Sequence, residues 1–256
     1  MSITLISVMN KSDRLSDADC ERMTAAVGAS LAKDFAPYHG ITPALEFVPR
    51  GGTPDPLGCP CEMLDEPDVP DAAGYHFVNG GTKWIKVFCN PSLDNSGTAL
   101  QGRNAISVTL DHEIKELIKD PSANRWADGP NNLDFAFEVC DAPEGDVYET
   151  DGVSLSNFVT EDFFDPEAST GTKLDFLQLV KDPFETRPFG YQTIRTEPGK
   201  ESQVFAHHNG KGNVIIVMPG IVLACGAKFE GHKVRYKFRK ARQRGRKTHL
   251  HTKAEA

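Results

Sequence analysis

The chain has 256 residues, of which 39% are hydrophobic and 25% charged, and its formal net charge is −8. These fractions are ordinary for a globular protein, so extensive disorder is excluded, and the length suits one large domain or two small ones. We find no run of 18 apolar residues and no basic, apolar leader at the N-terminus, so we expect neither a membrane span nor a signal peptide.

The first elements of the chain alternate between strand and helix patterns. Residues 1–8 predict an opening strand. Ser16 can cap a helix that continues to about Ala36, and Pro37 and Gly40 are expected to end it.

A strand, a long loop and a hairpin are expected next. Residues 45–49 alternate in hydrophobicity and predict a short strand, whereas residues 50–73 are dense in Gly, Pro and Asp and predict a long irregular loop. Two further strands, residues 74–78 and 84–89, flank the turn sequence Asn79-Gly80-Gly81, so we expect a hairpin.

The second half of the chain begins with a helix and is then rich in strands. Residues 104–119 predict a helix that Asp120-Pro121 ends, because a residue before proline is disfavoured in helical geometry. Residues 122–132 predict an irregular segment, and a short helix or turn is expected around Phe135–Cys140. The later strands are expected at residues 152–159, 189–195 and 213–218. The order of elements favours the α+β class.

Chemistry concentrates in the predicted helix that contains His112-Glu113-Ile114-Lys115-Glu116. Residues four apart share a helix face, so His112 and Glu116 project together while apolar residues such as Leu110 and Leu117 face the core. This is the geometry of the His-Glu-x-x-His metalloprotease helix, with a carboxylate in place of the second imidazole. The pattern predicts a Zn²⁺ site with His112 and Glu116 as ligands and Glu113 as the base that activates water. An amphipathic helix with a polar solvent face would show the same pattern.

Further polar residues downstream can complete such a site. Glu138 and Asp141 lie 22 and 25 residues beyond Glu116 in an apolar setting. We expect Glu138 to be the third ligand and Asp141 to orient the histidine, although the two roles can be exchanged. Tyr148 is a candidate to contact a developing oxyanion, with ordinary packing as the alternative.

The cysteines offer a weaker metal signal. Cys59-Pro60-Cys61 is the one close pair among six dispersed cysteines. No second Cys or His pair lies at zinc-finger spacing, so two plain thiols are favoured over a structural zinc site.

The run from Ser107 to Asp165 resembles phage- and prophage-encoded zincin-like metallopeptidases of the His-Glu-x-x-Glu type, and it is distantly similar to phosphate-induced plant proteins. The matching pieces, within residues 74–195, are DHEIKELIKDPSANRW, FEVCD, SLSNFVTEDFF, LDFLQLVKDPF and GYQTI. The resemblance implies a zincin-like domain over residues 1–227, with the active-site helix packed on a small mixed sheet. It also implies zinc bound by His112, Glu116 and Glu138. Replacing His by Glu116 makes the ligand set more anionic and lowers the Lewis acidity of the metal, which argues against strong peptidase activity.

The end of the chain is basic although the body is acidic. Residues 228–256 hold 11 Lys or Arg against 2 acidic residues, a balance of +9, whereas residues 1–227 have a balance of −17. We expect a final strand and a disordered tail that binds nucleic acid or an acidic protein surface, or that is merely solvated. The basic residues assigned to this tail are Arg239, Lys240, Arg242, Arg244, Arg246 and Lys247.

Two functions remain open from the sequence. The first is a zinc-dependent hydrolase of peptide bonds, favoured because Glu113 has no duty in a purely structural metal site. The second is a phage structural or assembly protein that keeps a zincin fold, with virion proteins or further copies of itself as partners. Either would be expected in the virion or the host cytoplasm, away from membranes.

Overall fold

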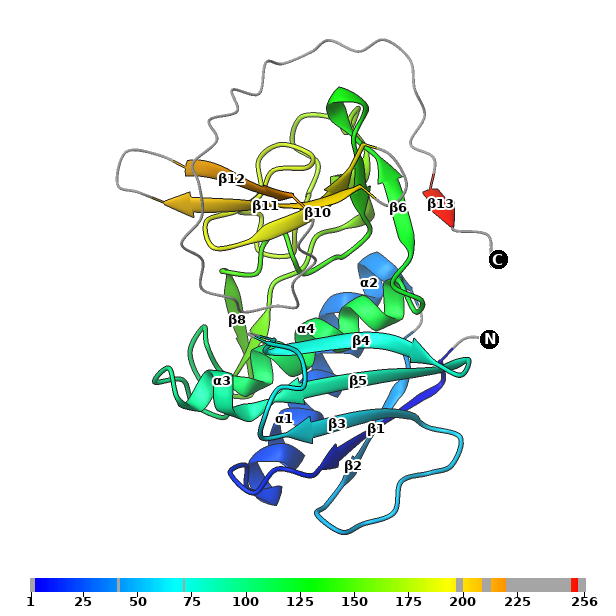
Figure 1. The fold of residues 1–256 in the computed structure, drawn as a ribbon, viewed down its shortest axis with the longest axis vertical. Helices are drawn as coiled ribbons and strands as arrows, with labels where there is room; N and C mark the ends of the chain where they lie inside the picture. Colours follow the sequence, from blue (N-terminus) through cyan, green and yellow to red (C-terminus); the bar gives the residue numbers. More distant parts are fainter. Residues whose placement is uncertain are drawn as a thin grey trace. The chain divides into compact units, whose positions relative to one another are not determined.

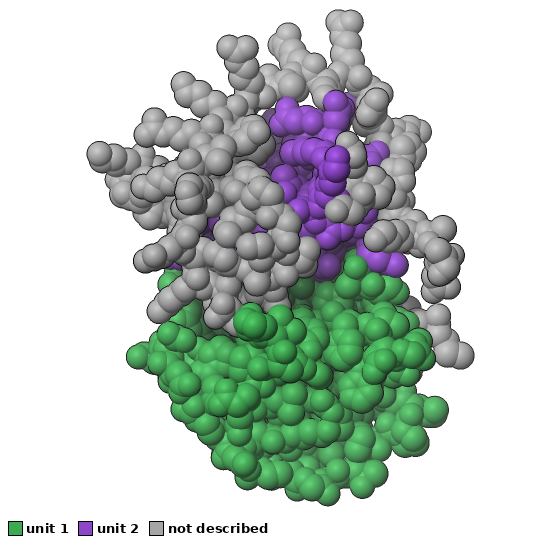
Figure 2. All heavy atoms as spheres, viewed as in Figure 1, with its two compact units in different colours: residues 1–123, 147–156, 223–228 green, residues 124–146, 157–222, 229–256 purple. Residues whose placement is uncertain are grey.

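A computed structural model describes residues 3–40, 42–70, 72–196, 200–208, 213–219 and 250–252 of the chain (Figure 1). Its contacts divide the chain into two compact units (Figure 2). Unit 1 takes in the described residues up to 123 together with 147–156, and unit 2 takes in those of 124–146 and from 157 to the end, apart from residues 223–228. Among the described helices, none is long and apolar enough to cross a membrane.

Unit 1 is built on a mixed five-stranded sheet. Across the sheet the strands are β2 (Ala44–Val48), β1 (Leu5–Asn10), β3 (Cys59–Leu64), β5 (Thr82–Phe88) and β4 (Gly74–Asn79). The first four run parallel, and β4 pairs antiparallel with β5 at the edge. The strand over residues 45–49 and the hairpin at Asn79-Gly80-Gly81 are therefore confirmed.

Helices cover one face of this sheet (Figure 1). The helices that contact the sheet are α1 (Asp17–Ser30) and α4 (Ile106–Lys119). A π-helical turn (Leu31–Phe35) and α2 (Ala36–His39) continue the chain after α1, and α3 (Cys89–Leu93) follows β5. Ser16 caps α1 as expected, because its side chain accepts a hydrogen bond of 3.0 Å from the Asp19 backbone amide. The helical run continues past the expected end near Ala36 to His39, because Pro37 lies in the first turn of α2, where a missing N–H is tolerated. Gly40 ends the run as expected.

The core of unit 1 lies between the sheet and these helices. Alternate residues of β3 are buried, as expected for a strand with one covered face, whereas five of the six residues of the central strand β1 are buried. The buried apolar residues include Ile6, Val8, Cys61, Met63, Ile85 and Val87 from the sheet, Met23 and Val27 from α1, and Leu110, Ile114 and Leu117 from α4. Because α4 packs against β4 and β5, its residues lie next to the edge of the sheet.

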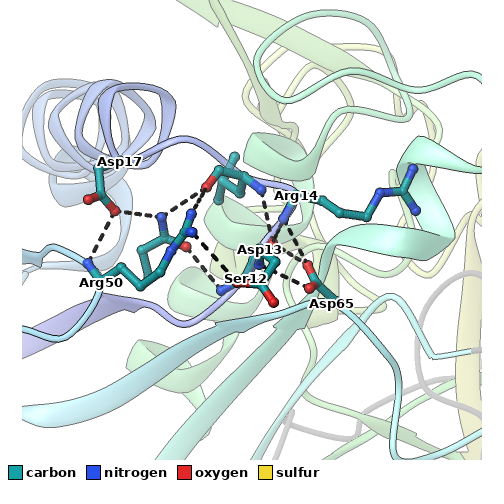
Figure 3. Close-up of polar contacts among 8 residues, drawn as sticks. Ser12, Asp13, Arg14, Asp17, Arg50 and Asp65 are labelled. Atoms are coloured by element: carbon teal, nitrogen blue, oxygen red, sulfur yellow. Dashed lines mark hydrogen bonds and ion pairs between the residues drawn. The ribbon is translucent and has the colours of Figure 1, made fainter.

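The carboxyl ends of the parallel strands carry a network of polar contacts (Figure 3). The Asp65 carboxylate, just after β3, accepts hydrogen bonds from the backbone amides of Asp13 (3.0 Å) and Arg14 (3.3 Å) and from the Ser12 hydroxyl. Asp17 accepts a bond of 3.2 Å from the backbone amide of Arg50, after β2. These groups bond one another and so fix the loops that follow β1, β2 and β3.

Unit 2 is mainly antiparallel. Its sheet has the order β12 (Asn213–Pro219), β11 (Glu201–His208), β10 (Tyr191–Arg195), β7 (Asp134–Ala136), β6 (Arg125–Asp128) and β13 (Leu250–Thr252). Short 3₁₀ helices occupy Pro130–Asn132 and Glu161–Phe164. A cluster of aromatic rings forms its core: Phe135, Phe137, Phe163, Phe164 and Phe184. The α+β class is confirmed, with a mixed sheet first and antiparallel strands later.

Two segments expected to be irregular contain strands. Strand β3 lies within residues 50–73, and β6 lies within residues 122–132. The segment Phe135–Cys140 is partly strand β7 and partly a turn, rather than a helix. The basic tail residues Arg239, Lys240, Arg242, Arg244, Arg246 and Lys247 lie outside the described residues.

Candidate metal centre

Helix α4 brings the first two expected ligands together. The helix extends to Lys119, and Asp120 leaves helical geometry before Pro121, as predicted. His112 Nε2 lies 3.2 Å from Glu116 Oε1, as the spacing of four residues allows. The residues are only 2% and 4% exposed, so the alternative of a polar face in open solvent is wrong.

Glu113 contacts a histidine that the sequence analysis did not single out. His76, on β4, places Nδ1 3.4 Å from Glu113 Oε2 and Nε2 3.2 Å from the backbone carbonyl oxygen of Asp120. Burial alone would lower the pKa of His76, but the neighbouring carboxylates of Glu113, Glu116 and Asp120 together outweigh burial, and the pKa is raised. The side chains are 6% and 2% exposed, so this contact is shielded from solvent.

A glycine allows the close approach of β4 to α4. A Cβ atom on Gly74 would lie 2.8 Å from Thr109 Cγ2 and 3.1 Å from Glu113 Cγ. Distances below about 3.4 Å are tighter than ordinary carbon contacts, which lie near 3.5–4.0 Å. Any larger residue at this position would therefore push the strand away from Glu113.

Other polar residues of α4 hold the hairpin of β8 (Val147–Thr150) and β9 (Val153–Ser156), which belongs to unit 1. Lys115 Nζ donates to Asp111 Oδ2 (2.5 Å) and to the Ser156 carbonyl oxygen (2.8 Å). The Ser156 backbone amide donates to Asp111 in return (2.8 Å). Burial raises the pKa of Asp111, and the Lys115 charge opposes that shift. This buried pair fastens the hairpin to the helix.

Tyr148 lies at the end of this network. Its hydroxyl is 3.0 Å from Lys115 Nζ and 2.5 Å from Ser30 Oγ. Burial raises the pKa of Tyr148 to about 12, with Lys115 acting against the shift. These contacts give the side chain a packing role in unit 1, and its role as an oxyanion contact stays a prediction.

Glu138 and Asp141 belong to unit 2, in the segment that follows β7. Asp141 is buried and its carbonyl oxygen accepts a bond of 3.0 Å from the Tyr191 amide. The roles of Glu138 as ligand and Asp141 as orienting residue stay predictions.

Two groups of largely buried side chains could hold a metal ion. They are His112 with Glu116 and Cys140, and His76 with Glu116 and Glu138. Imidazole nitrogen, carboxylate oxygen and thiolate sulfur are the donors that zinc binds in proteins, so the residues fit this ion. Glu116 belongs to both groups.

The cysteines of unit 1 form no disulfide bonds among the described residues. Cys20, Cys59, Cys61 and Cys89 are free and buried, and burial raises the pKa of each thiol, to about 12 for Cys20 and about 11 for Cys59 and Cys89. Among the described residues, neither Cys59 nor Cys61 belongs to a group that could hold a metal.

Neither family models, nor curated proteins, nor solved structures give a match to this chain. The candidate metal centre therefore stands on the geometry of its own residues. Sequence reasoning found His112, Glu113 and Glu116 but missed His76. The one available signal was the alternation of β4, which places His76 on the same side of the strand as the buried Gly74.

Proposed function

We propose that the protein binds Zn²⁺ through His112 and Glu116, in a zincin-like domain, and uses the site to hydrolyse peptide bonds. The observation that carries the proposal is the buried pair of His112 Nε2 and Glu116 Oε1, 3.2 Å apart, on the helix that also bears Glu113. The helix-on-sheet architecture of unit 1 supports the zincin-like assignment. Glu138 remains the third ligand and Asp141 the orienting residue that the sequence predicts.

The residues of unit 1 suit water activation. Zinc supplies Lewis-acid chemistry, which polarises a carbonyl group and makes water a stronger nucleophile at neutral pH. In this proposal the Glu113 carboxylate takes the proton from the attacking water and passes it to the leaving amine. His76 holds that carboxylate in place, and the buried setting of both side chains excludes bulk water.

One observation favours a second function, a structural or assembly protein with a structural metal ion. The sequence favours catalysis because Glu113 has no duty in a purely structural metal site, yet the Glu113 carboxylate contacts His76 at 3.4 Å. Glu113 thus ties α4 to β4, and its presence no longer separates the two functions. The resemblance to phage-encoded proteins suggests virion proteins or further copies of this chain as the partners of such a protein.

Two variants separate these functions. Glu113→Gln is nearly isosteric, so in the hydrolase it should keep fold and zinc content while cleavage falls on the order of 10²–10⁴-fold. His112→Ala removes a ligand, so zinc affinity and melting temperature should fall together. Both variants are compared with wild type for zinc content, melting temperature and cleavage of a broad peptide library. If neither wild type nor Glu113→Gln cleaves the peptides although both bind zinc, the result would favour the structural function.

A further inference from the structure

The hairpin of β4 and β5 carries aromatic residues on the face of the sheet that α4 does not cover. Side chains alternate along a strand, so Gly74 and His76 of β4 face α4, and Tyr75 and Phe77 lie on the other face. The register pairs Phe77 with Trp84 of β5, which places both rings on that same face. Tyr75, Phe77 and Trp84 are half-buried, so part of each side chain remains exposed. We call these three residues the aromatic face.

The rings of the aromatic face form one continuous surface. The ring centroids of Tyr75 and Phe77 are 5.3 Å apart. Those of Phe77 and Trp84 are 6.4 Å apart, and the two ring planes are 26° from parallel. These are the distances of interacting aromatic pairs, so the rings lie next to one another on the sheet. Adjacent exposed apolar groups, unlike single ones, often mark a place where a ligand or a partner binds.

The charged groups beside these rings are paired with one another. Lys86, which faces Tyr75 across the hairpin, binds Asp68 at 2.5 Å. Glu62 of β3 is the neighbour of Lys86 on its other side, and it binds Lys11 at 2.5 Å. These positive and negative charges balance, and all four side chains remain partly exposed.

This combination of rings and paired charges selects a class of ligand. A nucleic acid is held mainly by lysine and arginine residues that neutralise its phosphates, and the two lysines here are already paired with carboxylates. A sugar ring needs no net charge, because its C–H groups carry partial positive charge and pack on the negative face of an aromatic ring. Its hydroxyl groups can bond carboxylate and ammonium groups at the rim. Sugars with equatorial substituents, such as β-linked glucose and N-acetylglucosamine, present the flattest C–H faces.

We propose that the aromatic face is a binding site for an uncharged polysaccharide chain built from β-linked sugars of the glucose type. Phe77 and Trp84 stack on successive sugar rings. The partly exposed carboxylate of Asp68 and the ammonium group of Lys86 bond the hydroxyl groups of the sugars. The site is independent of the proposed metal site, because β4 and β5 lie between the aromatic face and α4.

The first test measures sugar affinity in the full chain by titration calorimetry, with cellohexaose and chitohexaose as probes. Wild type should bind at least one of them. Trp84→Leu keeps an apolar side chain but removes the ring, so it should weaken binding about tenfold or more, as the loss of an aromatic anchor does. Trp84→Phe keeps a ring and should retain most of the affinity. Tyr38→Leu, at a half-buried aromatic residue of α2, is the matched control and should bind as wild type. Absence of binding to both sugars, or equal binding by Trp84→Leu, would overturn the inference.

A second measurement covers the case in which Trp84→Leu does not fold. The chain has two tryptophans, and Trp126 is buried whereas Trp84 is half-buried, so acrylamide quenches mainly the fluorescence of Trp84. Bound cellohexaose or chitohexaose should protect that fluorescence in wild type, and binding without protection would overturn the inference. Two other results would also overturn it. Protection by a single-stranded oligothymidylate but by neither sugar would assign the aromatic face to nucleic acid. A dimer that dissociates in Trp84→Phe would assign it to a second copy of the chain.

Discussion

Lys115 is a charged residue that unit 1 buries completely. Its ammonium group is fully shielded and bonds the equally buried Asp111 at 2.5 Å. Lys115→Met should lower the free energy of unfolding by about 3–5 kcal/mol, because the Asp111 carboxylate would remain buried without its cation. Chemical denaturation measures the loss, and Lys33→Met, at an exposed position, is the control.

A double variant checks this reason. Asp111→Asn combined with Lys115→Met removes both charges and should recover part of the stability that the single change removes. If the loss in the free energy of unfolding of the double variant equals the sum of the losses of the two single variants, the two groups act independently.

Tyr148 makes the stability sensitive to alkaline pH. Its pKa rises from 10.0 to about 12 in the folded chain, so the folded state keeps a proton that the unfolded state releases. The stability that this residue contributes is therefore complete below pH 10 and disappears as the pH rises toward 12. Tyr148→Phe should cost about 1 kcal/mol at neutral pH, where two hydrogen bonds are removed, and much less near pH 12. Urea denaturation at several pH values tests this, and a constant difference would contradict it.

The sequence could predict the pair of candidate ligands but not the environment of Glu113. His112 and Glu116 lie together because residues four apart share one face of a helix, so helix geometry alone predicts their contact. His76 meets Glu113 because β4 pairs with β5 and packs under α4, and these are long-range contacts. The alternation of β4 indicates on which side of the strand His76 lies, but no local pattern indicates that this side meets Glu113.

Gly74 sets the distance between β4 and α4. Gly74→Ala would place a methyl group against Thr109, the Lys86 carbonyl and Glu113. We expect the free energy of unfolding to fall by about 1–3 kcal/mol, as it does when a core position is overpacked. The variant should also bind zinc more weakly, because the displaced strand carries His76. Gly80→Ala is the comparison in the same hairpin. A Cβ atom on Gly80 would meet open space, but the φ of 58° is a backbone conformation that residues with a side chain rarely adopt. Unchanged zinc affinity in Gly74→Ala would show that β4 can shift without disturbing the metal site.

Strand β3 shows where local composition misled the prediction. Gly, Pro and Asp dominate residues 50–73, which favours a loop. The structure nevertheless pairs Cys59–Leu64 between β1 and β5, and Cys61 and Met63 are fully buried. Tertiary pairing outweighs local propensity here, because a central strand gains burial on its covered face.

At the scale of the whole chain, charge is divided between an acidic body and a basic end. Residues 228–256 carry a balance of +9 against −17 for the rest. We expect the full chain to bind single-stranded nucleic acid with an affinity that falls steeply as the salt concentration rises. A chain truncated after Lys240 should show a weaker dependence of affinity on salt concentration, that is, a smaller salt slope. Titrations at several salt concentrations measure this slope. Identical slopes with and without the last residues would assign no binding role to them.

The central claim is that the chain holds one divalent metal at His112 and Glu116. The most direct measurement is plasma mass spectrometry of wild type and His112→Ala, each loaded with zinc and then dialysed. We predict about one zinc per wild-type chain and a large loss in His112→Ala, since removing a ligand lowers affinity and stability together. A wild-type chain that retains no zinc, or a His112→Ala variant that retains as much as wild type, would contradict the claim.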